Sequence, residues 1–163
     1  MDTIPVHALW LAQDDPKKNT AVLASKRGDL TLHKNVRSLP KRGVILEPLC
    51  GKVFGPEDHE LLTQRRGALV GLDCSWAHIE TSVESVMKRT RLQPRMLPLL
   101  LAANPVNWGK PGRLTTAEAL ATVLYLVGRR DQAADVLGAF RWGGRFFELN
   151  LSLIHISEPT RRL

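Results

Sequence analysis

Polar side chains follow three short apolar runs of the sequence, at the point where each run ends. They occupy residues 14–20 (DDPKKNT), 73–77 (DCSWA) and 104–109 (NPVNWG). In open parallel α/β sheets, ligands bind outside the carboxyl ends of the strands. If the three runs are strands of one such sheet, these loops belong to a single ligand-binding edge.

Among the residues in these loops, Asp73 is the clearest candidate for a functional role. A carboxylate that ends an apolar strand is partly desolvated, so it needs hydrogen-bond partners or a place in a cleft. Trp76 and Trp108 are more often packing residues than ligand platforms, because tryptophan buries a large area. The segment from Asp14 to Pro16 is equally typical of a simple turn.

Several well-marked functional classes are excluded by missing motifs. No GxxxxGK[ST] loop, HExxH or GxSxG motif occurs, and no GxGxxG follows the first strand, which argues against the best-known nucleotide, zinc-protease and hydrolase sites. Cys50 and Cys74 form no CxxC pair, so we expect neither a disulfide framework nor a structural zinc. Both thiols are expected to be free and buried.

Apolar patterning predicts strands that alternate with helices through the first two thirds of the chain. Short apolar runs bounded by turn residues predict strands, and proline or acids before a run with glycine after it predict helices. The expected strands are 5–12, 30–32, 43–46, 68–73 and 97–103, and the expected helices are 56–66 and 75–86. This alternation favours an α/β fold with a parallel sheet.

The last third is predicted to be helical. Apolar residues recur at helical spacing from Thr115 to Gly128, and a second helix is expected over 131–142. The Pro/Gly-rich segment 104–112 is interpreted as a hinge. We therefore expect an N-terminal α/β part over 1–96 and a mainly helical part over 97–150 that completes the ligand-binding cleft.

The chain of 163 residues is basic, with 23 Lys and Arg against 16 Asp and Glu and a formal net charge of +7. A polyanion such as RNA is the first partner to consider. The alternative is that the basic residues are solvated surface charges of a protein that binds no polyanion. No apolar stretch or leader pattern indicates a membrane or secretory protein, so a cytoplasmic location is expected. The candidate RNA-contacting residues are Lys17, Lys18, Lys88, Arg89, Arg91 and Arg95.

The C-terminal run 151–161 (LSLIHISEPTR) resembles the read-through translation of a common sequencing-library adapter. We expect the whole tail over 151–163 to be non-native and the natural part of this sequence to be cut after about Asn150. A genuine amphipathic terminal segment is the alternative. Mass spectrometry of the protein from its source organism distinguishes the two.

Five segments, taken in order, resemble one known family. They are DPKKNT (15–20), GLDCSWA (71–77), LLLAANPVNWGKP (99–111), LTTAEALA (114–121) and FRWGGRFFELN (140–150). The family is that of the ribosome-biogenesis aminocarboxypropyltransferases, which use S-adenosylmethionine to modify a pseudouridine in small-subunit ribosomal RNA. The resemblance covers residues 6–150 and implies a SPOUT-like α/β fold with a deep trefoil knot.

The resemblance also implies a set of site residues. Trp76 and Ala77 would hold the methyl group away from the nucleophile, and Asp73 would orient the ribose or help to remove the imide proton of the uracil; we favour orientation. Asn19 departs from the family, where many members carry cysteine, and Gly112 stands where an aromatic residue is frequent. The implied cofactor-binding residues are Thr20, Leu72, Asp73, Trp76, Leu97, Gly112 and Thr116.

The implied reaction is transfer of the 3-amino-3-carboxypropyl group from S-adenosylmethionine to ring nitrogen three of a methylated or unmethylated pseudouridine. We expect a monomer that acts on small-subunit rRNA or a pre-ribosomal particle and requires no metal. One alternative is an RNA methyltransferase of the same knotted class. Another is a non-catalytic assembly factor that binds RNA through its basic face.

Overall fold

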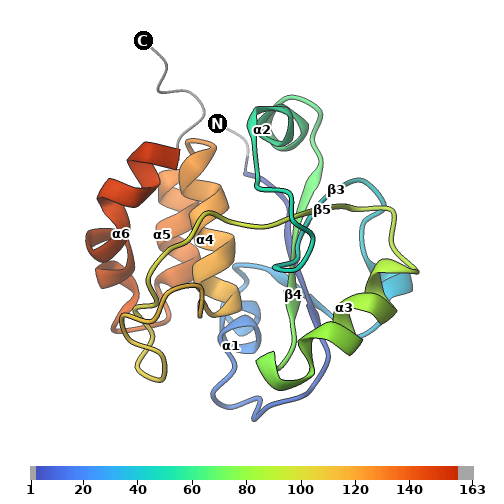
Figure 1. Cartoon of the computed structure of the whole chain (residues 1–163), viewed down its shortest axis with the longest axis horizontal. Helices are drawn as coiled ribbons and strands as arrows, with labels where there is room; N and C mark the ends of the chain where they lie inside the picture. Colours follow the sequence, from blue (N-terminus) through green and yellow to red (C-terminus); the bar gives the residue numbers. More distant parts are fainter. Residues whose placement is uncertain (1–2, 158–163) are drawn as a thin grey trace.

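Five strands form one parallel sheet at the centre of the computed structural model, which describes residues 3–157 (Figure 1). Their order across the sheet is β2-β1-β4-β3-β5, and every pairing is parallel. The strands are β1 Val6–Trp10, β2 Thr31–His33, β3 Gly43–Leu46, β4 Ala68–Asp73 and β5 Gln93–Arg95. The α/β parallel-sheet fold class expected from the sequence is confirmed.

Helices cover both faces of this sheet. In Figure 1, α4, α5 and α6 gather on one side of the strands together with α1, whereas α3 lies on the other side. Two short 3-10 turns, η1 Val36–Ser38 and η2 Trp76–His78, connect elements. The helices are α1 Thr20–Lys26, α2 Pro56–Thr63, α3 Ile79–Met87, α4 Thr116–Leu126, α5 Arg130–Leu137 and α6 Gly143–Ser157.

The alternation of side chains along β4 decides which way its last residue faces. Leu69 packs into the core cluster that contains α4, whereas Val70 and Leu72 pack into the cluster that contains Val86 of α3. Gly71 lies directly under α4, because a Cβ atom there would come within 2.8 Å of the Thr116 Cγ2 atom. Asp73, two residues further on, faces the same helix.

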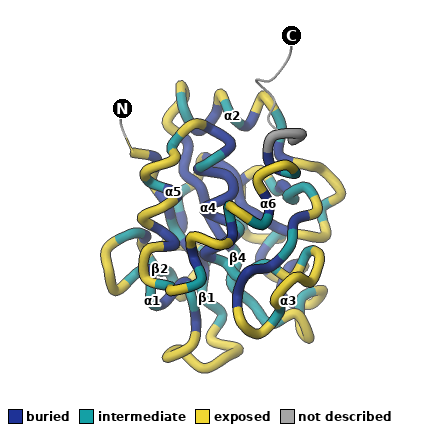
Figure 2. The backbone as a smooth tube through the Cα atoms, turned by 90° about the vertical axis from the view of Figure 1, so that its left-hand side faces the viewer, coloured by how far each residue is buried: buried dark blue, intermediate teal, exposed yellow. Residues whose placement is uncertain are grey.

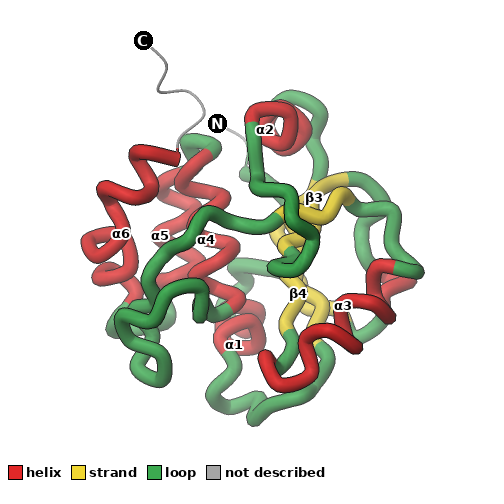
Figure 3. The backbone as a smooth tube through the Cα atoms, in the orientation of Figure 1, coloured by secondary structure: helices red, strands yellow, loops and turns green. Residues whose placement is uncertain are grey.

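Most predicted elements are confirmed, with three corrections. Strands 43–46 and 68–73 have the expected bounds. The expected strand over 97–103 is wrong: the fifth strand is β5, and 97–103 enters the long loop between β5 and α4, drawn green in Figure 3. The apolar run has another cause, because Leu100 and Ala103 of this loop are buried in the core.

The helix expected over 131–142 is also wrong at its end. Helix α5 stops at Leu137, and a turn over 138–142 leads into α6. Phe140 stacks on Trp142 in that turn, with ring centroids 4.9 Å apart. The helix expected over 75–86 is divided, since Ser75 caps η2 and α3 begins only at Ile79.

The core joins the first and the last parts of the chain. One cluster of buried residues contains side chains from β1, β3 and β4 together with side chains from α4, α5 and α6, and Figure 2 shows α4 as a buried element. Helix α6 continues past Asn150, and Ile154 is 1% exposed. A foreign origin for 151–163 stays a prediction, and residues 158–163 lie outside the described part.

Candidate functional site at the carboxyl edge of the sheet

The loop between β1 and α1 comes to the end of β4. Asn19 caps α1, since its side-chain oxygen accepts a hydrogen bond from the Val22 N–H at 2.9 Å. The amide nitrogen of the same side chain donates to Asp73 Oδ2 at 2.5 Å and to both carboxylate oxygens of Asp14 at 3.0 Å. Asn19 is buried, so its orientation is fixed between the two acids.

Helix α4 supplies the second partner of Asp73. Thr116 lies in its first turn, and its hydroxyl donates to Asp73 Oδ1 at 2.6 Å. The adjacent Ala117 N–H donates to the Thr20 hydroxyl at 3.2 Å, which joins α4 to α1. We call Asp14, Asn19, Asp73 and Thr116 the carboxyl-edge cluster.

The surroundings of Asp73 change its affinity for protons. Burial raises the pKa of its carboxyl group above the usual range, the hydrogen bonds from Thr116 and Asn19 lower it in part, and the nearby Asp14 charge raises it again. The net effect is a raised pKa. Asp73 therefore holds a proton more readily than an exposed aspartate does.

Glu118 organises the loop between β5 and α4, a role that the sequence did not reveal. Its side chain is fully buried and accepts hydrogen bonds from Ala103 N at 2.7 Å, from Asn104 Nδ2 at 2.8 Å and from Thr115 N at 2.9 Å. The sequence signal was the capping pattern TTAE, which correctly predicted a helix start. It gave no sign that the carboxylate also binds the loop before the helix.

Asn150 of α6 holds the same loop from the other side. Its side chain is fully buried, accepts from Leu101 N at 2.7 Å and donates to Leu101 O at 2.8 Å, as a neighbouring strand would. Gly112 closes the loop with a positive φ of +69° and donates its N–H to Leu100 O at 2.8 Å. The conformation favours glycine, so a side chain at this position would strain the loop.

Exposed apolar side chains flank the cluster in sequence. Trp76 is 38% exposed, Trp108 50% and Leu99 69%, so neither tryptophan is a fully buried core residue. Arg113, in the loop before α4, lies over the Trp76 ring at 5.3 Å from the centroid. Leu72 and Leu97 are partly buried and pack against the two core clusters.

The two cysteines are half-buried rather than buried, which corrects the expectation. Cys74 follows Asp73 directly, and burial together with the Asp73 and Glu47 charges raises the pKa of its thiol to about 11. At neutral pH this thiol is protonated and therefore a weak nucleophile. No group of three His, Cys, Asp or Glu side chains suited to a metal ion occurs among the described residues.

The candidate RNA-contacting residues fall into three groups by their location and exposure. Lys17 and Lys18 are exposed at the carboxyl edge of the sheet. Lys88, Arg89 and Arg91 are exposed at and beyond the far end of α3, where Lys88 pairs with Glu84. Arg95, by contrast, is buried and is therefore not the surface residue that the sequence suggested.

Arg95 is buried inside the protein. Its Nε atom donates to Asp58 Oδ2 at 2.8 Å, and its Nη1 atom donates to the Pro94 carbonyl at 2.7 Å. Desolvating this guanidinium is tolerated because the buried carboxylate compensates its charge. Arg95 is therefore a structural residue of the sheet edge and not a surface contact for RNA.

Comparisons with known proteins agree on one family. The family model described as "Ribosome biogenesis protein, C-terminal" matches residues 44–160. The 16S rRNA aminocarboxypropyltransferase of Methanothermobacter thermautotrophicus is 39% identical over 140 residues, covering 86% of this chain and 80% of the relative. That of Methanopyrus kandleri is 41% identical over 136 residues, covering 83% and 78%.

A solved structure shows the same fold. The SAM-dependent rRNA:acp-transferase Tsr3 from Vulcanisaeta distributa superposes with a TM-score of 0.85 at 37% sequence identity. The match covers 96% of this chain and 84% of that one. Among the described residues, no helix is long and apolar enough to cross a membrane.

Proposed function

Since this chain belongs to the 16S rRNA aminocarboxypropyltransferase family, we propose that its carboxyl-edge cluster positions S-adenosylmethionine for attack by a pseudouridine. The enzyme is an S-adenosylmethionine-dependent rRNA transferase of ribosome biogenesis. Transfer to ring nitrogen three is our proposal. The observation that supports the position of the co-substrate site is the hydrogen-bond network of Asn19, Asp73 and Thr116, which joins β4, α1 and α4 at one point.

The residues at this edge fit such a co-substrate. S-adenosylmethionine combines an apolar base and a sulfonium with a polar ribose and an amino-acid end, and its sulfonium activates both the methyl and the aminocarboxypropyl carbon. Trp76 and Leu99 offer exposed apolar surface, while Thr20 and Thr116 offer hydroxyl groups near the buried carboxylate. Backbone groups at Gly112 add contacts without a side chain.

Orientation decides which group is transferred, so the residues act mainly by position. We propose that Trp76 and Ala77 enclose the methyl group, which leaves the aminocarboxypropyl carbon facing the RNA. Trp76 suits this role because much of its ring is exposed although Arg113 already lies over it. Leu72 and Leu97 would contact the adenosine through their backbone groups.

Asp73 is proposed as an orienting residue. Both of its oxygens already accept a hydrogen bond, one from Asn19 and one from Thr116, which fixes the carboxylate and leaves a lone pair on each oxygen for a ribose hydroxyl. The raised pKa would also suit a proton acceptor. The fixed geometry supports orientation more directly.

Lys17 and Lys18 are proposed to hold RNA phosphates beside the reacting nucleotide. Both are exposed and lie only two and three residues before Thr20, so they approach the site from the solvent side. Lys88 and Arg89 would contact RNA beyond it. These contacts carry no sequence information and would supply affinity and register.

Nucleoside mass analysis of small-subunit rRNA after incubation with the protein and S-adenosylmethionine tests the proposal. The expected result is a gain of one aminocarboxypropyl group on a pseudouridine. A gain of one methyl group would identify a methyltransferase instead. Calorimetry that detects no S-adenosylmethionine binding would favour a non-catalytic assembly factor.

We also infer the deep trefoil knot, a monomeric state, a cytoplasmic location and independence from metal ions. The knot is supported by the resemblance to SPOUT-like proteins. An experimental chain trace through residues 97–126 tests it. Sedimentation tests the monomer, and transfer in the presence of a chelator tests the metal requirement.

A further inference from the structure

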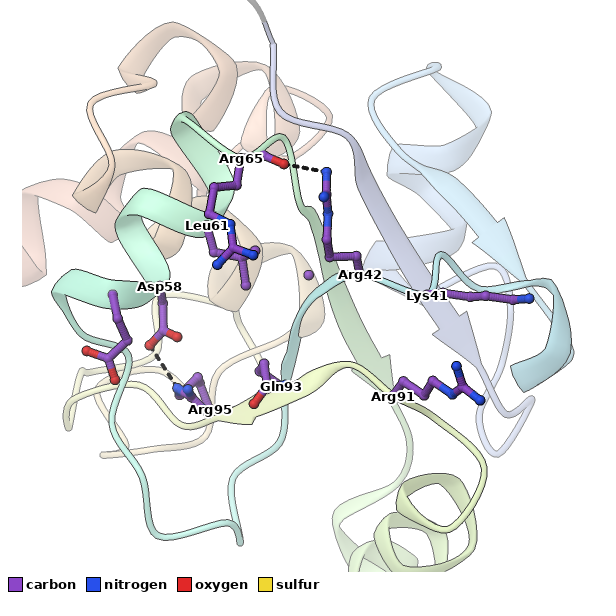
Figure 4. A pocket seen from close by; sticks show the side chains of 10 residues that line it. Lys41, Arg42, Asp58, Leu61, Arg65, Arg91, Gln93 and Arg95 are labelled. Atoms are coloured by element: carbon purple, nitrogen blue, oxygen red, sulfur yellow. Dashed lines mark hydrogen bonds and ion pairs between the residues drawn. The ribbon is translucent and has the colours of Figure 1, made fainter.

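A basic pocket of about 270 Å³ lies at the amino edge of the sheet, opposite the carboxyl-edge cluster. Its walls come from α2 and from the segments that begin β3 and β5 (Figure 4). Gly43 at its base pairs with Ala68, the first residue of β4, whereas Asp73 is the last residue of that strand. At roughly 3.3 Å per strand residue, the two sites are about 16 Å apart along the sheet.

The acids of this pocket are already neutralised. Asp58 pairs with Arg95 at 2.8 Å, and Glu57 pairs with Lys52 at 3.0 Å. No other carboxylate lines the pocket. Its remaining charge is therefore positive.

Four cations remain around the opening, and within the described residues none has an acidic partner. Lys41, Arg42, Arg65 and Arg91 are all exposed. Arg42 is held in place because its Nη2 atom donates to the Arg65 carbonyl at 2.5 Å. In Figure 4, Arg42 points up to the Arg65 carbonyl, and Lys41 and Arg91 extend together to the right of the view, away from Arg42 and Arg65.

We propose that this pocket binds a backbone phosphate of the RNA substrate, at a point remote from the reacting nucleotide. Guanidinium and ammonium groups recognise phosphate by charge and by paired hydrogen bonds. Leu61 is the one large apolar residue of the lining, so the pocket suits a sugar-phosphate and not a base. The proposal rests on the rRNA substrate of the proposed function.

The 16 Å separation limits what can occupy both sites. A single nucleotide in the transfer site does not reach the amino edge, whereas a folded or extended RNA of several nucleotides does. The pocket would therefore contribute affinity for long RNA and nothing for S-adenosylmethionine. This difference separates the pocket from the transfer site experimentally.

The test uses the full chain carrying the double substitution K41E/R65E. Its affinity for a full-length small-subunit rRNA transcript is measured by filter binding across a salt series. We expect at least a tenfold weaker affinity than the parent at about 100 mM salt. We also expect the salt slope to flatten by about 0.7 to 0.9, the value for the loss of one phosphate contact.

R141E/R145E is the matched control, because it makes the same change in net charge at two exposed arginines, one in the turn before α6 and one in its first turn. This control should bind RNA nearly as well as the parent. Both variants should bind S-adenosylmethionine like the parent by calorimetry, which also shows that they are folded.

Three outcomes overturn the pocket proposal. The first is parent-like RNA affinity in K41E/R65E, and the second is an equal loss in the control, which would show a general charge effect. The third is parent-like RNA affinity together with thermal stabilisation by inorganic phosphate in the parent alone, which would identify a free-anion site. A parent that binds no rRNA at all refutes the substrate of the proposed function as well.

Discussion

The side chain of Asn19 makes hydrogen bonds to three different residues. It caps α1 and donates to both Asp14 and Asp73 through one amide group. A cysteine at this position would have only a weak S–H donor and could not connect two carboxylates in this way. The sequence identified this asparagine as a departure from the family, but a cap residue gives no sign of a bridge to an acid 54 positions away.

Replacing Trp76 with alanine should weaken S-adenosylmethionine binding severely. The change removes an apolar wall and an aromatic face for the sulfonium, together worth about 2 to 4 kcal/mol. Calorimetry measures the loss, and circular dichroism confirms that the variant is folded. Trp108→Ala is the comparison variant, since it removes another partly exposed tryptophan ring, 50% exposed against 38% for Trp76. Unchanged binding by a folded Trp76→Ala protein would remove Trp76 from the site.

Asp73→Asn should raise stability at neutral pH and weaken the binding of S-adenosylmethionine. The pKa of Asp73 in the folded protein lies above its ordinary value of 3.8, so its contribution to stability is present below 3.8 and is lost as pH rises through the folded pKa. The asparagine variant does not titrate. Its advantage in free energy of unfolding should therefore grow with pH and then level off.

Thermal melts from pH 3 to pH 8 check the stability effect. The role in transfer is read separately from kcat and KM. An orienting role predicts that KM for S-adenosylmethionine rises while turnover persists, whereas a proton-accepting role predicts loss of kcat. Equal stability of variant and parent across the pH range would contradict the raised pKa.

At the level of elements, the loop between β5 and α4 is the part that apolar patterning did not predict. Its run 97–103 alternates between core and surface for reasons of local packing, and a short apolar run does not distinguish a strand from a buried loop. The true edge strand β5 contains Gln93 and Pro94, which give no strand signal. Glu118 and Asn150 hold the loop by hydrogen bonds that only the folded structure reveals.

Other elements were predictable because their signals are local. Gly43–Leu46 and Ala68–Asp73 are continuous apolar strands bounded by glycine, proline or polar residues, and the start of α4 has a capping box. The sheet order β2-β1-β4-β3-β5 depends on long-range pairing, which no local pattern carries. The position of Asp73 was therefore predictable, whereas its partners were not.

Asn150→Ala should destabilise the protein and loosen the site. The change leaves the partly buried N–H and carbonyl of Leu101 without their Asn150 partner, at a cost of about 1 to 3 kcal/mol, or a decrease of several degrees in Tm. S-adenosylmethionine affinity should fall as well, because Leu97 and Gly112 belong to the released loop. Differential scanning calorimetry and titration measure the two effects.

Asn107→Ala is the control, since Asn107 lies in the same loop and contributes backbone groups to its hydrogen bonds. It should melt and bind like the parent. A stable Asn150→Ala variant with parent-like binding would show that α6 does not organise the site.

At the scale of the whole molecule, two of the basic surfaces lie at opposite edges of the sheet. Lys17 and Lys18 lie at the carboxyl edge, and the pocket lined by Lys41, Arg65 and Arg91 lies at the amino edge. The sequence showed these residues as dispersed clusters, and only the folding of the sheet brings the second set together. An RNA that touches both edges must extend along the strands.

Reversing Lys17 and Lys18 to glutamate should weaken RNA binding and leave S-adenosylmethionine binding nearly unchanged. Each lost phosphate contact should flatten the dependence of log affinity on log salt by about 0.7 to 0.9. Filter binding over a salt series measures the slope, and calorimetry measures the co-substrate. An unaltered slope with abolished co-substrate binding would instead assign this loop to the carboxylate end of S-adenosylmethionine.

The hydrogen bonds between Asn150 and Leu101 impose an order of events on biosynthesis. Chains leave the ribosome amino end first, so β1 to β5 and α4 emerge before the last helix exists. Until α6 has been made, nothing pairs with Leu101, and the loop that carries Leu97 and Gly112 has no fixed course on that side. A nascent chain without α6 therefore lacks the contact that fixes Leu101, and the loop before α4 is ordered only after this helix has been added.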